Sequence, residues 1–223
     1  MNDISFCNDL RVRSCPVCNH LDRQMAEYFA ERQGLLSKSR DAQTEYTDQG
    51  GFCPLHTWQL AAFSSPRGIS RGHSTIIRRM ADLLDLAADT YAERKAGAFP
   101  VKAPDDCMVC HFLADAESRY IETFSAFLGE DGNLELYKRS HGPCLRHLQQ
   151  VLARMKDRSG EICLIRMAAC RLREISESMV QYDLKLEQLK RELLTRDEKD
   201  AYRRGLVMLS GEKTVFSPFM KGL

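Results

Sequence analysis

Cysteine and histidine residues stand in close pairs along the chain, with the spacing of metal ligands. Cys15 and Cys18 form a Cys-x-x-Cys pair, and Cys53 and His56 form a Cys-x-x-His pair further on. Two such pairs of thiolate and imidazole donors are what a closed tetrahedral site requires. These four residues therefore predict one Cys₃His metal site.

The second half of the chain contains the same donors in the same order. Cys107 and Cys110 are followed by Cys144 and His147. Their offsets from the corresponding ligands of the first half are 92, 92, 91 and 91 residues. Ligands in such close register indicate a duplicated unit, in which each copy is expected to hold its own metal ion.

Zinc is the first choice for both sites, because Cys₃His is a common closed structural shell for Zn²⁺. We therefore expect two Zn²⁺ ions per chain. An iron–sulfur cluster held by three thiolates and one histidine remains an alternative, and so does thiol redox chemistry at a Cys-x-x-Cys pair. Cys107 to His111 also matches the attachment string of c-type haem. In the first half, however, Asn19 stands at the position that corresponds to His111, so the duplicated feature is the four-ligand set and not the haem string.

The elements that position these ligands are expected to be helices, because apolar residues recur at helical spacing and proline is confined to element edges. Gly34 is expected to end the first helix, and Gly205 and Gly211 to break the polar periodicity of the tail past Asp200. A heptad pattern predicts one long helix near the C-terminus. The expected helices cover about 19–33, 54–63, 74–97, 110–128, 134–140, 144–151 and 160–195.

The fold class predicted is all-α, with two tandem repeats of a metal-pinned helical unit followed by the heptad-patterned helix. The first repeat is expected over 1–100 and the second, with the long helix and tail, over 101–223, the two forming one compact unit. The seam of the 160–195 helix either packs within the chain or forms a homodimer contact.

Other chemistry-bearing residues are interpreted as structural. Trp58 is expected to pack behind the first site, and Cys163 and Cys170 to be buried small side chains. Glu117 is assigned to a solvated helix face. We find no nucleophile–base pair, no phosphate-binding glycine loop and no open catalytic ligand set, so no enzymatic activity is expected.

Composition and charge exclude several function classes. The formal net charge is +1, which disfavours a nucleic-acid-binding protein, and the arginines at 67, 71, 78 and 79 are interpreted as a solvated face. No run of about 20 apolar residues could span a bilayer. The first residues lack the features of a secretory signal, so a cytoplasmic protein with reduced cysteines is expected.

The motifs resemble those of an uncharacterised bacterial family of duplicated helical proteins, a domain of unknown function. The likeness lies in the Cys-Pro-x-Cys pair at Cys15, the segment from Gly51 to His56, and the segment from Gly142 to His147. A softer likeness covers the ending from Arg196 to Gly211. The resemblance implies the helical fold and the metal ligands, but no activity.

Together these observations predict a non-enzymatic zinc-binding protein that acts as a protein-interaction or scaffold module, with an unidentified protein partner. The alternative is a redox- or metal-responsive protein that uses its cysteine sites as a switch.

Overall fold

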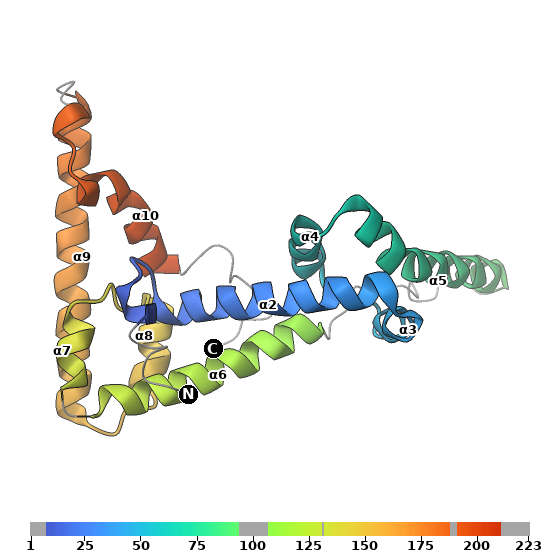
Figure 1. The fold of residues 1–223 in the computed structure, drawn as a ribbon, viewed down its shortest axis with the longest axis horizontal. Helices are drawn as coiled ribbons and strands as arrows, with labels where there is room; N and C mark the ends of the chain where they lie inside the picture. Colours follow the sequence, from blue (N-terminus) through green and yellow to red (C-terminus); the bar gives the residue numbers. More distant parts are fainter. Residues whose placement is uncertain (1–7, 94–106, 131, 188–190, 211–223) are drawn as a thin grey trace. The chain divides into compact units, whose positions relative to one another are not determined.

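A computed structural model describes residues 8–93, 107–130, 132–187 and 191–210 (Figure 1). These residues form helices connected by turns, and no strand occurs among them. No helix within these ranges has the length and apolarity needed to cross a membrane.

In each half of the chain, two short helices stand between two long ones. After a helical turn at residues 8–11 come α2 (Pro16–Lys38), α3 (Arg40–Asp48), α4 (Pro54–Phe63) and α5 (Pro66–Glu93). The next four are α6 (Met108–Leu128), α7 (Asn133–Lys138), α8 (Leu145–Leu152) and α9 (Arg158–Glu187). A short 3₁₀ turn, η1 (Arg191–Leu193), and α10 (Arg196–Ser210) complete the described chain. The all-α prediction is confirmed for these residues.

Local sequence signals explain where several helices begin. Proline is the first residue of α2, α4 and α5, where its missing N–H costs no hydrogen bond and its fixed φ suits the helix. Ser39 caps α3, since its side chain accepts a hydrogen bond from the backbone N–H of Ala42 at 3.3 Å.

The chain forms two compact units that do not follow the expected boundary at residue 100. Unit 1 comprises the described residues up to Arg23 and from Asp115 onward, and unit 2 comprises those from Gln24 to Ala114. Helix α2 therefore passes from unit 1 into unit 2, and α6 passes back. Each unit is built from both halves of the sequence.

Each unit has its own core of large side chains. In unit 1, Tyr120 and Phe124 of α6 are fully buried together with Tyr137 of α7. In unit 2, Phe29 of α2 and Leu60 of α4 are buried. The pairs Tyr28–Phe112 and Arg32–Met108 show that α2 and α6 run antiparallel within unit 2.

Two glycines expected to end or break periodic segments, Gly34 and Gly205, lie inside helices instead. Helix α2 continues through Gly34, and α5 begins at Pro66 and contains Gly72, earlier than the predicted start near Ser74. Helix α10 contains Gly205, where an added Cβ would lie 3.2 Å from Sδ of Met179 on α9. Gly205 therefore permits close packing of two helices rather than ending one.

The heptad seam predicted over 160–195 is shorter in the structure and partly covered within unit 1. Helix α9 extends to Glu187, and residues 188–190 lie outside the described part. Helix α10 packs along α9 (Figure 1), and Ile175 is buried there, whereas Ile165 and Met179 are 49% and 41% exposed.

Candidate metal centres

The eight predicted ligands form two clusters, but their pairing differs from the prediction. Centre 1 lies in unit 1 and consists of Cys15, Cys18, Cys144 and His147. Centre 2 lies in unit 2 and consists of the other four predicted ligands, Cys53, His56, Cys107 and Cys110. Each Cys-x-x-Cys pair therefore meets the Cys-x-x-His pair of the other half, and the expectation of one site per repeat was wrong.

Helix length explains this exchange. Helix α2 has 23 residues, so its ends are about 34 Å apart at 1.5 Å per residue. Helix α3, with 9 residues, rises only about 14 Å and is too short to retrace that distance. Cys53 therefore does not return to the beginning of α2, and α6 instead brings the second half of the chain to it.

Every ligand pair is placed by the start of a helix. Cys53 and Cys144 are the N-cap residues of α4 and α8, with nearly equal backbone angles (φ −61°, ψ 161° and φ −64°, ψ 165°). Cys15 and Cys107 directly precede α2 and α6, and their carbonyls accept hydrogen bonds from residues four positions later, at 2.9 and 3.1 Å. Each centre thus joins two helix N-termini, whose dipoles favour thiolates.

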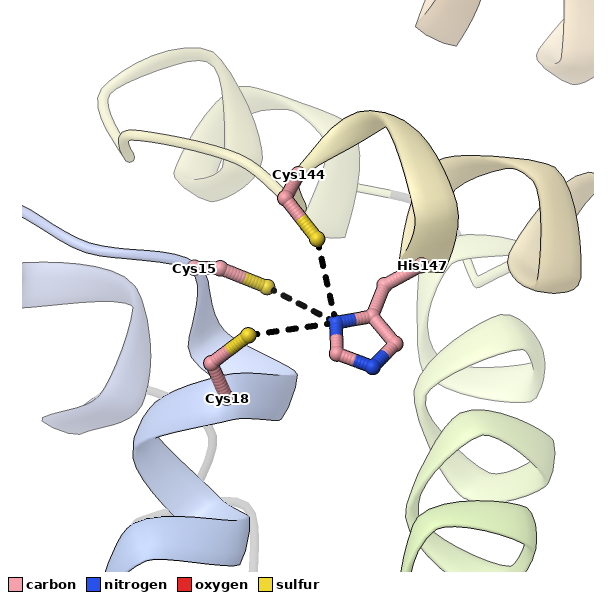
Figure 2. Close-up of side chains that lie close together, drawn as sticks. All are labelled: Cys15, Cys18, Cys144 and His147. Atoms are coloured by element: carbon pink, nitrogen blue, oxygen red, sulfur yellow. Dashed lines mark hydrogen bonds between the residues drawn. The ribbon is translucent and has the colours of Figure 1, made fainter. Parts of the chain in front are cut away.

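Centre 1 is completely enclosed. Its four ligands are each at most 1% exposed. Figure 2 shows the three thiols directed at Nδ1 of His147, at 3.3 Å from Cys15, 3.4 Å from Cys18 and 3.3 Å from Cys144. Donors that share one zinc ion lie about 3.6 Å apart for sulfur and nitrogen, given bond lengths of about 2.3 and 2.0–2.1 Å. The donor set therefore fits one tetrahedral ion.

Centre 2 has the same geometry. The thiols of Cys53, Cys107 and Cys110 lie 3.2, 3.5 and 3.4 Å from Nδ1 of His56. The sulfurs of Cys53 and Cys110 are 4.0 Å apart, close to the roughly 3.8 Å expected around one zinc ion. His56 is fully buried, and Cys110, at 9%, is the most exposed of the four ligands.

The electrostatics of centre 1 favour a positive charge beside His147 Nδ1. Burial and hydrogen bonds with Cys144 and Cys18 raise the pKa of Cys15. Hydrogen bonds from Cys15 and Cys18 hold the pKa of Cys144 far below that of an ordinary thiol. Burial acts to lower the pKa of His147, but hydrogen bonds with Cys144, Cys18 and Glu117 raise it well above its usual value. A metal cation bound to Nδ1 would interact favourably with the same three sulfur atoms in place of a proton.

Centre 2 also contains a thiol with a shifted pKa. Burial raises the pKa of Cys107, but the hydrogen bond with His56 and backbone hydrogen bonds at Cys53 and Cys110 outweigh it and lower the pKa to about 6. A thiol with such a pKa gives up its proton readily to a metal ion.

Glu117 distinguishes centre 1 from centre 2. Its Oε1 lies 2.7 Å from Nε2 of His147 and also accepts a hydrogen bond from Arg146 at 2.9 Å. A carboxylate on the second nitrogen of a ligating histidine fixes the tautomer that leaves Nδ1 free for the metal. In centre 2, Nε2 of His56 is buried and has no hydrogen-bond partner among the described residues.

The sequence interpretation missed Glu117. It is 6% exposed rather than on a solvated face, and Leu113, Tyr120 and Phe124, at helical spacing on α6, are buried as well. A charged residue within the apolar stripe of a helix was the available signal, since buried charges are nearly always paired.

Trp58 and Cys170 also differ from expectation. Trp58 is 77% exposed, so it does not pack behind a metal centre. Cys170 is exposed and Cys163 is partly buried, and neither belongs to a metal cluster among the described residues.

A network of polar side chains in unit 1 links Asp9 to the beginning of α2 and to α6. The carboxylate of Asp9 is 1% exposed and accepts hydrogen bonds from Tyr120 at 2.9 Å, Asn19 at 3.0 Å and Arg23 at 2.8 Å. The ring of His20 stacks on Tyr120 with centroids 4.3 Å apart. This network holds the first turn of α2 against α6.

No protein-family model, curated protein or solved structure matches the chain. The resemblance to a duplicated bacterial family therefore rests on the motifs alone, and the two buried Cys₃His clusters within a helical protein are what the structure supports.

Proposed function

We propose that each centre binds one Zn²⁺ ion and that the protein is a non-enzymatic, zinc-stabilised helical module for protein interaction. The observation that carries this proposal is the pair of buried Cys₃His clusters, each uniting ligands from both halves of the chain. Metal binding then supplies folding free energy directly, because neither cluster exists in the unfolded chain.

Donor distances favour a single ion over an iron–sulfur cluster. Two metal–ligand bonds of at most about 2.3 Å cannot hold donors more than about 4.6 Å apart on one ion. The donor atoms within the two centres are 3.2–4.0 Å apart, so one ion can bind all four donors of each centre. In a cluster, by contrast, the ligands bind different iron atoms and must stand further apart.

Burial favours a structural site over a catalytic or redox site. All four positions of each tetrahedron are filled by protein, so no position is open for water or substrate. The seven ligands other than Cys110 are at most 2% exposed, and oxidants reach buried thiols poorly. The redox-responsive alternative has no such observation in its favour.

We also infer that α2–α5 and α6–α9 are two copies of one unit that have exchanged their ligands. Besides the ligand offsets, Gly51 and Gly142 both precede a Cys-x-x-His pair and adopt positive φ, +82° and +77°. Tyr46 and Tyr137, at the same offset, would each lie within about 3.2 Å of a Cβ on these glycines. The tandem repeats of the sequence would then be intertwined.

The homodimer contact through residues 160–195 stays a prediction. Apolar side chains of α9 that α10 leaves exposed, such as Val180 and Leu184 at 55% and 42%, are available for it.

Elemental analysis of protein purified without added metal tests the proposal. We expect a colourless protein with two zinc ions per chain, and Co²⁺ substitution should give the intense visible absorption of tetrahedral thiolate coordination. A brown protein containing iron and sulfide would contradict it. Unchanged thermal unfolding after verified metal removal would contradict the structural role.

A further inference from the structure

A cavity of about 310 Å³ in unit 1 has four cationic side chains in its lining. It lies between the end of α7, the following residues Arg139 to His141, and helices α9 and α10. Its volume is at the lower end of the range for small-molecule sites. The charged residues of its lining are Lys138, Arg139, Arg171, Arg204 and Glu174.

Arg171 is fixed in this cavity by its own contacts. Its Nη2 donates to the backbone oxygen of Tyr137 at 2.8 Å, and its guanidinium carbon lies 4.7 Å from the centroid of the Tyr137 ring. Its Nη1 is buried and has no hydrogen-bond partner among the described residues. A buried guanidinium N–H without an acceptor costs free energy, so an acceptor that the described side chains do not supply, an ordered water or a ligand atom, is expected beside it.

Two further buried polar atoms lie beside Arg171 and also lack partners within the described chain: Nε2 of His141 and the hydroxyl of Tyr137. Gly142 explains why all three groups gather here. A Cβ on Gly142 would lie 2.6 Å from Arg171 Nη1 and 3.0 Å from the Tyr137 hydroxyl, so only glycine permits this approach.

The other arginines contribute positive charge. Arg204 is held by a hydrogen bond to Asp200 at 2.9 Å, and the exposed Arg139 makes no side-chain hydrogen bond to another described residue. Burial and the charges of Arg204, Arg171 and Arg13, opposed only by Asp200, lower the pKa of His141 to about 4. Lys138 pairs with Glu135, and Arg204 with Asp200, so Arg171 and Arg139 are the lining cations without a carboxylate partner among the described residues.

Unit 2 has no such arrangement at the corresponding place. There the Tyr46 hydroxyl lies 3.2 Å from Nε2 of His73, and the side chain that crowds Gly51 is the apolar Ile76. The unpartnered guanidinium N–H in unit 1 is therefore not a requirement of the helix packing that both units share.

We propose that this cavity binds a small molecule through a phosphate group, with Arg171 and His141 as the inner contacts and Arg139 at its mouth. Arginine presents several N–H donors in a planar fork that matches phosphate oxygens, and hydrogen bonds to a charged acceptor are the strong ones.

Calorimetric titration of the zinc-loaded full chain with inorganic phosphate and with pyrophosphate tests this site, with sodium chloride of equal ionic strength as the reference. Binding should be saturable and weaken with added salt. Arg171→Met and Arg139→Gln should each weaken it by about tenfold. Arg166→Gln, at an exposed position of α9 outside the cavity, should leave it unchanged.

Heat no larger than that of chloride, or binding that persists in both cavity variants, would overturn the proposal. Arg139 is exposed, so its variant remains informative if Arg171→Met fails to fold. Zinc content measured on every variant separates a lost anion site from a lost metal centre. Tighter binding of malonate than of phosphate would also overturn the assignment, because it would indicate a carboxylate site.

Discussion

At the scale of single residues, Glu117 should make centre 1 the tighter of the two metal sites. Its carboxylate orients His147 at 2.7 Å, whereas His56 Nε2 has no partner among the described residues. Loss of such an orienting carboxylate typically lowers metal affinity by 10–100-fold. We expect Glu117→Gln to weaken zinc binding at centre 1 by about tenfold, measured by competition with a chromophoric chelator.

The control for this change is Glu122→Gln, an exposed position on the same helix. Wild-type protein and the control should release zinc in two steps of different affinity. The Glu117 variant should show one broadened step. Two unchanged steps would show that the carboxylate does not tune the metal.

His141 should make the protein less stable in mild acid. Its pKa is about 4 in the folded chain and about 6.5 when unfolded, so between these values the unfolded chain binds more protons. The free energy of unfolding therefore falls as the pH decreases from 6.5 to 4. We expect His141→Gln to reduce this loss by about 1–2 kcal/mol, less than the full shift because the side chain is only partly buried.

Denaturant unfolding at pH 7 and pH 4.5, in buffers free of phosphate, measures this difference. Protonation of the metal ligands also weakens the protein in acid, but it affects wild type and variant alike. Equal pH dependence in the two proteins would contradict the assignment.

At the scale of the helix, glycines inside α2 and α5 should respond in opposite ways to a methyl group. Around Gly34 an added Cβ meets nothing within 4 Å, so Gly34→Ala should raise the free energy of unfolding by about 0.5–1 kcal/mol. At Gly72 an added Cβ would lie 3.1 Å from Cβ of Leu36, an atom close to the backbone of α2.

In Gly72→Ala, crowding against Leu36 should therefore cancel most or all of the gain in helix propensity. Its free energy of unfolding should be lower than that of Gly34→Ala by about 1 kcal/mol or more. Chemical denaturation with saturating zinc measures both. Equal stabilisation by the two substitutions would show that α2 and α5 are not in the close contact described.

At the scale of the whole molecule, the exchange of ligands between halves can be read from metal content. Cys15→Ser with Cys144→Ser disrupts centre 1 alone, so one zinc ion per chain should remain. Cys15→Ser with Cys53→Ser disrupts both centres, so no tightly bound zinc should remain. No zinc in the Cys15/Cys144 variant and one zinc ion in the Cys15/Cys53 variant would instead support the pairing expected from the sequence.

The order of helices was largely predictable because its signals are local. Proline at the start of α4 and the short helix near 134–140 were expected and are present as Pro54–Phe63 and Asn133–Lys138. Gly34 and Gly205 misled because glycine lowers helix propensity by about 1 kcal/mol, which packing readily overrides. Met179, 3.2 Å from an added Cβ at Gly205, is a contact that no local pattern reveals.

The sequence by itself determined which residues are ligands and where they lie on helices. A spacing of three places both donors of each pair, such as Cys144 and His147, on one helical turn regardless of the rest of the fold. Only the tertiary structure decided that Cys15 and Cys18 meet that pair and that Glu117 supports it. The same eight ligands satisfy either pairing, and the choice depends on the length of α2 and the antiparallel path of α6, which no spacing of ligands encodes.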